Sequence, residues 1–279
     1  MNAYCSLLPD TSVWLNKNNY LEPYVNYYFR HSAYGKYPLV GISMKNAEAW
    51  CEWKTQQIIE SEDFKKLNIA EFIVRLPNEA EWKKAAQGKL GDDAIWPWAG
   101  NTLKMQGGKK RDENTSLLNT LLNETFQDKY HYDIGSISAP VDAYWPNTIG
   151  LYNICGNAAE WVQERKAMGG SWKDLPFRAR IDYPNEILEE GYTSAKIGFR
   201  AVIEIISYKK NLQTAALNIN AKTIGKQLAF VKDSLYASVF ETSNLLYNTF
   251  LNETKCTNCS PQNDAWGRFS QYPYQNQYG

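Results

Sequence analysis

The chain has 279 residues, enough for one large domain or two small ones with a full hydrophobic core. Its 30 Lys and Arg residues balance 30 Asp and Glu residues, and this zero formal charge excludes the basic surface typical of nucleic-acid binding. The two histidines, His31 and His131, are too few for a metal site that needs three imidazoles.

An aromatic lead-in opens the chain over residues 1–37, rich in Tyr, Asn and Pro and without a helical or strand period. We expect it to be irregular but ordered and packed on the following domain, because flexible linkers avoid so much ring surface. Residues 39–43 predict a short buried strand, and Ser43 caps a helix whose apolar residues recur at helical spacing. A second helix begins after Asn78 in the pattern of a capping box and ends at Gly88.

The second half of the chain changes character twice. Residues 89–150 predict long loops, and a compact, glycine-marked region follows and ends in a strand over GFRAVIEII. Beyond it, a long amphipathic helix is predicted within residues 222–250. Its apolar residues, at helical spacing, are Ile224, Leu228, Val231, Leu235 and Val239. We expect this stripe to pack on a partner protein, with packing on its own domain as the alternative.

Six motifs in order carry a resemblance to a known family. They are YPLVGIS with its helix, RLPNEAEWKKAA, WPWAGN, APVDAYWPNTIGLYNICGNAAEW, GGSW and IGFR. They resemble the formylglycine-generating enzyme (sulfatase-modifying factor) domain, a family that also includes iron-dependent sulfoxide synthases. The resemblance implies an irregular α+β domain over residues 38–205, related to C-type lectins and low in regular secondary structure. We expect a C-terminal helical extension and an irregular tail over residues 206–279.

The flanks resemble a narrower group. The segments PDTSVWLNKNNYLEPYVNYYFRHSAYGKYPLVGIS and GGSWKDLPF are similar to parts of the GldK/PorK-type outer-membrane lipoproteins of Bacteroidetes. Those proteins form a periplasmic ring in type IX secretion and gliding motility. The resemblance therefore implies a non-catalytic ring subunit at the inner face of the outer membrane, with other machine subunits or a second copy as partners. No signal peptide or membrane span is visible, and Cys5 lacks the apolar run that precedes a lipid anchor.

The catalytic groups of the family are absent from the positions where the resemblance places them. Two cysteines after the GGS motif bind copper in the oxidase branch, and counting from Gly169 places them at Asp174 and Ala179. Neither residue replaces the soft thiolates that Cu(I) requires. The sulfoxide synthases use three histidines, and we expect His31 and His131 at surface or packing positions. The chain is therefore predicted to be a pseudoenzyme.

The resemblance also implies structural calcium that ties down the irregular loops. One family site has the pattern Asn-x-x-Gly-x-Ala-x-Glu, matched here by Asn153, Gly156, Ala158 and Glu160. The Asn and Glu would supply side-chain oxygens and the other two residues backbone carbonyls, which suit a hard cation. A second family site maps onto Asn119, Thr120, Asp133 and Gly135. The alternative for the first site is a metal-free network of hydrogen bonds.

Most other conspicuous side chains are expected to be structural. Arg75 and Glu79 are expected in salt bridges or helix caps. Buried pairing with nearby Asp and Glu is expected for Arg178, Arg180 and Arg200, with anion binding as the alternative. Those expected in the core are Cys51, Trp82, Cys155, Trp161 and Trp172. Cys256 and Cys259 predict a local disulfide or two free thiols, because zinc would need two more ligands.

Two other functions stay open. A metal- or cofactor-dependent oxidase on the same fold predicts a pocket with perturbed ionisable groups near Asp174, Arg178 and Arg180. A calcium-stabilised module that binds glycans or peptides predicts an exposed calcium with open coordination positions. The surroundings of Asp174 and of Asn153 therefore discriminate between these functions.

Overall fold

Short helices and strands are joined by long ordered loops in this fold. The computed structural model describes residues 7–15, 21–105, 115–121, 137–209 and 227–254. The helices are α1 (Glu22–Tyr27), α2 (Met44–Glu60), α3 (Glu62–Lys65), α4 (Glu79–Gln87) and α6 (Asn244–Glu253), with single 3-10 turns at η2 (Thr11–Trp14), η3 (Ser32–Tyr34) and η4 (Pro176–Ala179). The strands are β1 (Ile69–Arg75), β2 (Ala159–Val162), β3 (Lys166–Met168), β4 (Ile197–Gly198), β5 (Val202–Tyr208), β6 (Leu228–Lys232) and β7 (Leu235–Ser238).

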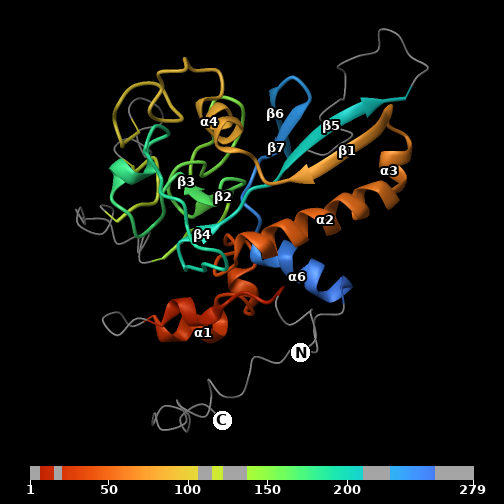
Figure 1. The fold of residues 1–279 in the computed structure, drawn as a ribbon. Coiled ribbons are helices and arrows are strands. Elements are labelled where there is room, and N and C mark those ends of the chain that lie inside the picture. The colour runs from red at the N-terminus through yellow and green to blue at the C-terminus, as the bar shows by residue number, and fades with distance from the viewer. Residues whose placement is uncertain (1–6, 16–20, 106–114, 122–136, 210–226, 255–279) are drawn as a thin grey trace, which may run out of the picture.

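Two sheets organise these elements (Figure 1). The larger sheet is antiparallel with the strand order β1-β5-β7-β6, and the smaller has the order β3-β2-β4 with β2 and β4 parallel. One face of the larger sheet, with Phe72 and Ile205, joins the core under α2 and α6. The other face, with Val202 and Leu235, joins a second core under α4. The α+β prediction is confirmed.

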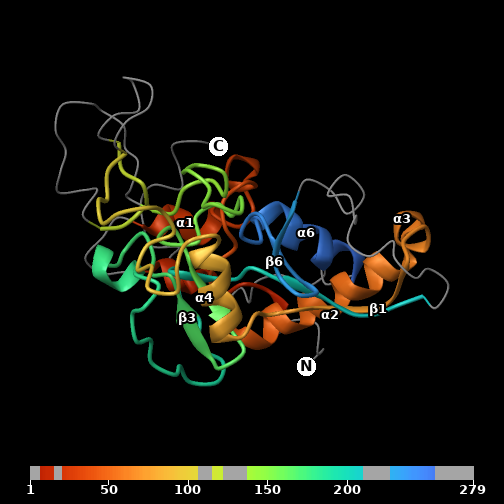
Figure 2. The same ribbon diagram turned by 90° about the horizontal axis from the view of Figure 1, so that it is seen from above.

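Local capping signals place the two main helices where the sequence predicts them. The Ser43 hydroxyl accepts a hydrogen bond from the Asn46 amide at the start of α2. The Asn78 side chain and Glu81 form the reciprocal capping box of α4, and Gly88 follows its last residue. Helix α2 lies beside α6 in both views (Figures 1 and 2). In the described ranges no helix combines the length and apolar character needed to cross a bilayer.

The strand predicted over residues 39–43 is wrong. This segment is buried, but in the described ranges it contains no β-bridge, and the neighbouring bridge joins Pro38 to Ser243. Gly41 has a φ of 75°, which breaks an extended ladder, and a Cβ there would lie 2.6 Å from the Asp10 carbonyl oxygen. The Gly41 amide instead donates to the Ser194 carbonyl, so the chain enters α2 through a buried loop.

The long helix predicted within residues 222–250 is also wrong. Residues 228–238 form the β6–β7 hairpin, which pairs with β5 and completes the larger sheet, and the helix is confined to α6. Asp233 has a φ of 47° in the two-residue turn, a conformation that ends any helix. The described part of the apolar stripe packs in the protein's own core through Leu235 and Val239. The alternative of packing on its own domain therefore applies to these residues. Ile224 lies outside the described residues.

The lead-in lies on the domain as one aromatic cluster. The Trp14 ring stacks on Trp172 with 5.9 Å between centroids and contacts Tyr28 at 4.6 Å. The buried Tyr28 hydroxyl donates to the Pro38 carbonyl at 2.7 Å, which ties α1 to the start of the following loop. The lead-in thus forms short helical turns rather than a wholly irregular chain, and its rings cover the loop that carries Trp172.

Candidate functional site

The motif NICGNAAE forms a tight buried turn that touches the other predicted calcium segment. Asn153, Gly156 and Asn157 have φ values of 50°, 80° and 62°. A Cβ on Gly156 would lie 2.7 Å from the backbone oxygen of Asn119, so only glycine fits there without a shift. The Asn157 amide donates to that same oxygen at 2.9 Å. The turn therefore brings residues of the two predicted sites into direct contact.

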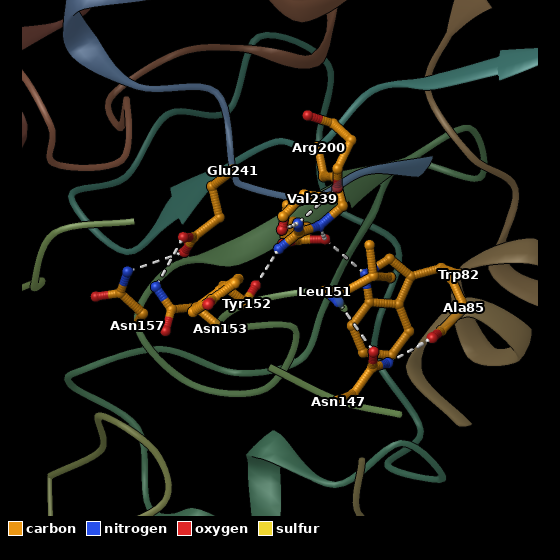
Figure 3. A network of polar contacts seen from close by, with 12 residues as sticks. Trp82, Ala85, Asn147, Leu151, Tyr152, Asn153, Asn157, Arg200, Val239 and Glu241 are labelled. Carbon is orange, nitrogen blue, oxygen red and sulfur yellow. Dashed lines mark hydrogen bonds and ion pairs between the residues drawn. The ribbon is translucent and has the colours of Figure 1, made fainter. Parts of the chain in front are cut away.

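The carboxyl group of Glu241 is hydrogen-bonded to two asparagines of this turn (Figure 3). Glu241, between β7 and α6, accepts hydrogen bonds from Asn153 Nδ2 at 3.1 Å and from Asn157 Nδ2 at 2.9 Å. Its side chain is 3 % exposed. Burial raises the pKa of Glu241 to about 8, although the nearby Arg200 charge acts in the opposite direction.

A buried ion pair lies beside this carboxylate. Arg200 donates to Glu160 with Nη2–Oε1 and Nε–Oε1 distances of 2.8 and 3.0 Å, and both residues are 1 % exposed. The second Glu160 oxygen accepts from Trp82 Nε1 at 2.8 Å and from Arg200 Nε at 3.2 Å. The remaining guanidinium donors bind the carbonyls of Tyr152, Ser238 and Val239. The pair is therefore fully hydrogen-bonded, as a buried ion pair requires.

Asn153 fits an oxygen ligand of a cation better than Glu160 does. Its Oδ1 atom is buried without a hydrogen-bond partner, and the amide orientation is fixed because Nδ2 faces Glu241 and the Pro140 carbonyl. Calcium takes amide and backbone carbonyl oxygens as ligands at about 2.3–2.6 Å, so this oxygen is of the kind that it binds. Glu160 already accepts from Arg200 and Trp82 on both oxygens, and within the described ranges no three His, Cys, Asp or Glu side chains cluster as metal ligands.

The second predicted site shows the same orphaned oxygen. Asn119 is fully buried, and its Nδ2 donates to the Ile137 carbonyl at 3.0 Å and to Asn157 Oδ1 at 3.3 Å. Its Oδ1 is buried with no partner. Thr120 is buried beside it, whereas Asp133 and Gly135 lie outside the described residues. Each predicted site therefore contributes one unsatisfied amide oxygen.

The two positions that the resemblance assigns to the copper-binding cysteines, Asp174 and Ala179, make other contacts in this structure. Asp174 accepts a hydrogen bond from the Ser171 hydroxyl and an ion pair from Lys196 Nζ at 2.9 Å. Ala179 is fully buried, and its Cα would lie 2.8 Å from a Cβ on Gly170. Neither position offers a thiolate, and both are tied into the local packing.

The groups that an oxidase would use near this turn do not converge. Arg178 lies 5.6 Å over the Tyr183 ring, and Arg180 pairs with Asp182 at 2.5 Å. A pocket of about 440 Å³ lies elsewhere, and its lining includes Trp98, Trp145, Asn153 and Cys155 but none of these arginines. Burial raises the pKa of the Cys155 thiol, so the thiol in that pocket is the unreactive neutral form at neutral pH.

Most structural interpretations of other residues hold in the described part of the chain, but the buried pairing predicted for two arginines is wrong: Arg178 is exposed over the Tyr183 ring, and the Arg180–Asp182 pair is largely exposed. Predicted core residues buried to 4 % exposure or less are Cys51, Trp82, Cys155, Trp161 and Trp172. Arg75 pairs with Glu81 at 2.7 Å and with Glu204, and Glu79 pairs with Lys83 and Lys166. His31 is exposed and caps η3. His131, Cys256 and Cys259 lie outside the described residues.

Two residues of this site escaped sequence reasoning. Asn157 lies inside the recognised motif but not at one of its four ligand positions. Glu241 follows the motif by about 80 residues, in a segment that shares none of the recognised blocks. A buried carboxylate there has no sequence signal of its own, because a lone Glu is usually a surface residue.

The sequence of this chain matches the model of a known family. The sequence model described as "Sulfatase-modifying factor enzyme 1-like domain" matches residues 22–205, more than half of the chain. The chain belongs to this family. Its likeness to the GldK/PorK-type group stays a prediction.

Curated members of the family align with about half of the chain. The formylglycine-generating enzyme of Thermomonospora curvata is 35 % identical over 129 residues, 46 % of this chain and 33 % of that protein. The inactive C-alpha-formylglycine-generating enzyme 2 of Bos taurus is 28 % identical over 151 residues, 50 % of this chain and 40 % of that protein. The chain thus spans less than half the length of these relatives.

Solved structures of two other proteins show a partial likeness. Treponema denticola variable protein 1 aligns with 60 % of this chain and 71 % of its own, at a TM-score of 0.41 and 22 % identity. PvdO of Pseudomonas aeruginosa aligns with 60 % of this chain and 61 % of its own, at a TM-score of 0.40 and 19 % identity. The family assignment rests on the sequence match rather than on these two similarities.

Proposed function

We propose that this protein is a non-catalytic, structural member of the sulfatase-modifying factor family. The observation that carries the proposal is the closure of both thiol positions, by the Asp174–Lys196 ion pair and by the buried Ala179. A Cu(I) centre needs soft sulfur ligands, which neither residue provides. A curated relative of similar identity is itself named as an inactive enzyme, so loss of chemistry has a precedent in the family.

An oxidation assay tests the loss of chemistry. The purified protein is incubated with Cu(I), oxygen and a cysteine peptide, and mass spectrometry follows conversion of the cysteine to formylglycine. The Thermomonospora curvata enzyme, which retains 35 % identity over the aligned segment, serves as the positive control. We expect conversion in the control alone. Formylglycine produced by this protein would overturn the proposal.

We further propose that the protein works in the periplasmic ring of a type IX secretion and gliding machine, at the inner face of the outer membrane. The support is the likeness of its flanks to GldK/PorK-type proteins. The lead-in contributes a cluster of aromatic side chains in which Tyr27 is exposed, and aromatic residues are favoured at protein interfaces. Cross-linking and co-purification from native membranes should recover other ring subunits. Recovery of the chain as a free monomer would contradict this role.

Calcium is proposed as a structural component of the same protein. Asn153, with the backbone carbonyls of Gly156 and Ala158, would hold one ion, and Asn119 with Thr120 another. The support is the pair of buried amide oxygens that lack hydrogen-bond partners. Glu160 would join the first site only if it shares its charge with Arg200. Bound calcium would supply charge that satisfies these oxygens and stiffens the loops.

A thermal-shift titration tests the calcium proposal. The midpoint of unfolding of the chelated protein should rise with added Ca²⁺, because a ligand that binds only the folded state stabilises it. Mg²⁺ at equal concentration should raise it less, since its smaller octahedral shell suits irregular loops poorly. A midpoint that does not respond to Ca²⁺ would remove calcium from the proposed function and leave the non-catalytic role standing.

A further inference from the structure

The chain from the last residue of β7 towards α6 passes the calcium-type turn and is hydrogen-bonded to it through Glu241. This segment, residues 238–242, lies outside the part of the chain that the family model matches. Arg200 donates to the carbonyls of Ser238 and Val239, and the Tyr152 amide donates to Val239 at 3.0 Å. The rings of Tyr152 and Phe240 lie 5.1 Å apart. Glu241 then enters the turn itself (Figure 3).

Glu241 dictates the orientation of two amides. Each oxygen of Glu241 accepts one hydrogen bond, so Asn153 and Asn157 both present Nδ2 to it. The oxygen of each amide therefore faces away from Glu241. For Asn153 this leaves Oδ1 buried without a protein partner.

The orientation of the Asn157 side-chain amide also affects Asn119, a residue of the second predicted site. Asn157 Oδ1, turned away from Glu241, accepts from the Ala139 amide at 2.7 Å and from Asn119 Nδ2 at 3.3 Å. Asn119 must therefore present its nitrogen to Asn157, and the Ile137 carbonyl holds that nitrogen from the other side. Its Oδ1 is thereby fixed in the opposite direction, and it too is buried without a partner. Glu241 thus sets the direction of both orphaned oxygens together with the backbone of Ala139, which also accepts from Asn157 Nδ2 at 3.2 Å.

We propose that Glu241 is a positioning residue for cation binding: it fixes Asn153 Oδ1 directly, and Asn119 Oδ1 through Asn157, in the ligand orientation. This inference rests on the proposed calcium role. Outer-shell partners of this kind hold ligands in their binding orientation and contribute to metal affinity. Cation binding thereby depends on docking of residues 238–242, a segment outside the family domain.

The variant Glu241→Gln separates this role from simple packing. Gln has the same shape but offers one acceptor and one donor group, so its Nε2 would face the Nδ2 of one asparagine. The simplest relief is rotation of that asparagine amide, which places N–H groups where the orphaned oxygen lies. We expect the affinity for Ca²⁺ to fall by roughly 10- to 100-fold, the usual cost of losing an outer-shell partner.

Isothermal titration with Ca²⁺ on the full chain provides the test. The matched control is Glu253→Gln, which removes a carboxylate from α6 that accepts only a hydrogen bond from Trp53 in the described structure. We expect wild-type affinity in this control. Wild-type affinity in Glu241→Gln would overturn the inference alone. A wild-type chain that binds no Ca²⁺ would overturn the calcium proposal itself.

A measurement on the wild-type protein covers the case in which Glu241→Gln fails to fold. The side-chain amide protons of Asn153 and Asn157 should exchange slowly with solvent by NMR, before and after Ca²⁺ addition, because they stay on Glu241. Ca²⁺ should shift the Asn153 and Asn119 amide resonances together. Fast exchange of the Asn153 amide, or a shift of neither residue, would contradict the inference.

Discussion

The resemblance assigns the family's copper-binding cysteines to one turn of this protein and a calcium site to another, and the two turns differ in how their polar groups are satisfied. At the thiol turn, the replacement residue Asp174 is paired with Lys196 and Ser171. At the calcium-type turn, the retained residue Asn153 has a buried oxygen with no partner. The polar groups of Asp174 at the first turn have protein partners, whereas the second turn contains a buried oxygen that has none.

The difference supports the proposal that calcium binds at the second turn and that the first turn has no catalytic role. Buried polar groups in folded proteins are almost always hydrogen-bonded, so an orphaned atom indicates a missing partner. A turn without a ligand is expected to satisfy its polar groups with protein partners, as Asp174 does. The calcium-type turn instead keeps its asparagines in strained left-handed conformations and fixes them with Glu241.

The largest expected effect comes from the ion pair of the calcium-type turn. The variant Arg200→Met leaves Glu160 buried without a counter-charge and frees three backbone carbonyls. We expect a loss of about 3–5 kcal/mol in the free energy of unfolding, measured by urea denaturation. The control Arg180→Met breaks an exposed pair with Asp182 at the thiol turn and should leave the midpoint nearly unchanged. Equal losses of stability in the two variants would contradict the difference proposed between the two turns.

The next effect concerns the close approach of the two calcium-type segments. Gly156→Ala places a Cβ 2.7 Å from the Asn119 carbonyl oxygen at a φ of 80°. We expect a destabilisation of about 2–3 kcal/mol, together with weaker Ca²⁺ binding, because the segments must separate. Gly150→Ala is the matched control, since its φ is 96° but nothing lies within 4 Å of the added Cβ. A similar loss in both variants would assign the effect to backbone strain alone.

Local signals made part of this structure predictable from the sequence. Ser43 and Asn78 cap α2 and α4 through contacts within three residues, so their side chains alone announce the helix starts. The motif that includes Asn153 and Glu160 likewise places two candidate ligands in one short turn. What the motif does not reveal is that Glu160 is committed to Arg200, an interaction across 40 positions of the chain.

The errors lie where distant contacts override a local pattern. Leu228 to Val239 fit a helical period, yet the turn at Asp233 and pairing with β5 make them strands. Apolar residues in a hairpin that is buried on one face occur at intervals compatible with both periods. Glu241 was unpredictable for a related reason: its partners lie 84 and 88 positions away. Burial of a carboxylate is decided by those partners and not by its neighbours in sequence.

In the absence of calcium, the free energy of unfolding should depend on pH through Glu241 at the calcium-type turn, an effect of intermediate size. The folded-state pKa of Glu241 is raised to about 8 from 4.5, so the folded protein binds more protons than the unfolded chain between these values. Its contribution to stability is therefore present below about pH 4.5 and is lost as pH rises through 8, with a slope of at most about 1.4 kcal/mol per pH unit.

The variant Glu241→Gln, studied in a chelator by urea denaturation between pH 5 and 8, isolates this contribution. The wild-type free energy of unfolding should fall with pH more steeply than that of the variant, because Gln does not titrate. Glu253→Gln should follow the wild-type slope. Parallel slopes for wild type and Glu241→Gln would show that Glu241 is ionised throughout this range.

The smallest effect is expected at the thiol turn. Asp174→Asn removes the charge that pairs with Lys196, whose side chain is 34 % exposed, but keeps an oxygen for the Ser171 hydroxyl. We expect a loss of about 1 kcal/mol in the free energy of unfolding and no change in Ca²⁺ affinity. Lys196→Met should cost a similar amount, because both variants break one half-exposed pair. A larger loss for Asp174→Asn than for Lys196→Met would mean that its bond to Ser171, rather than the ion pair, closes this turn.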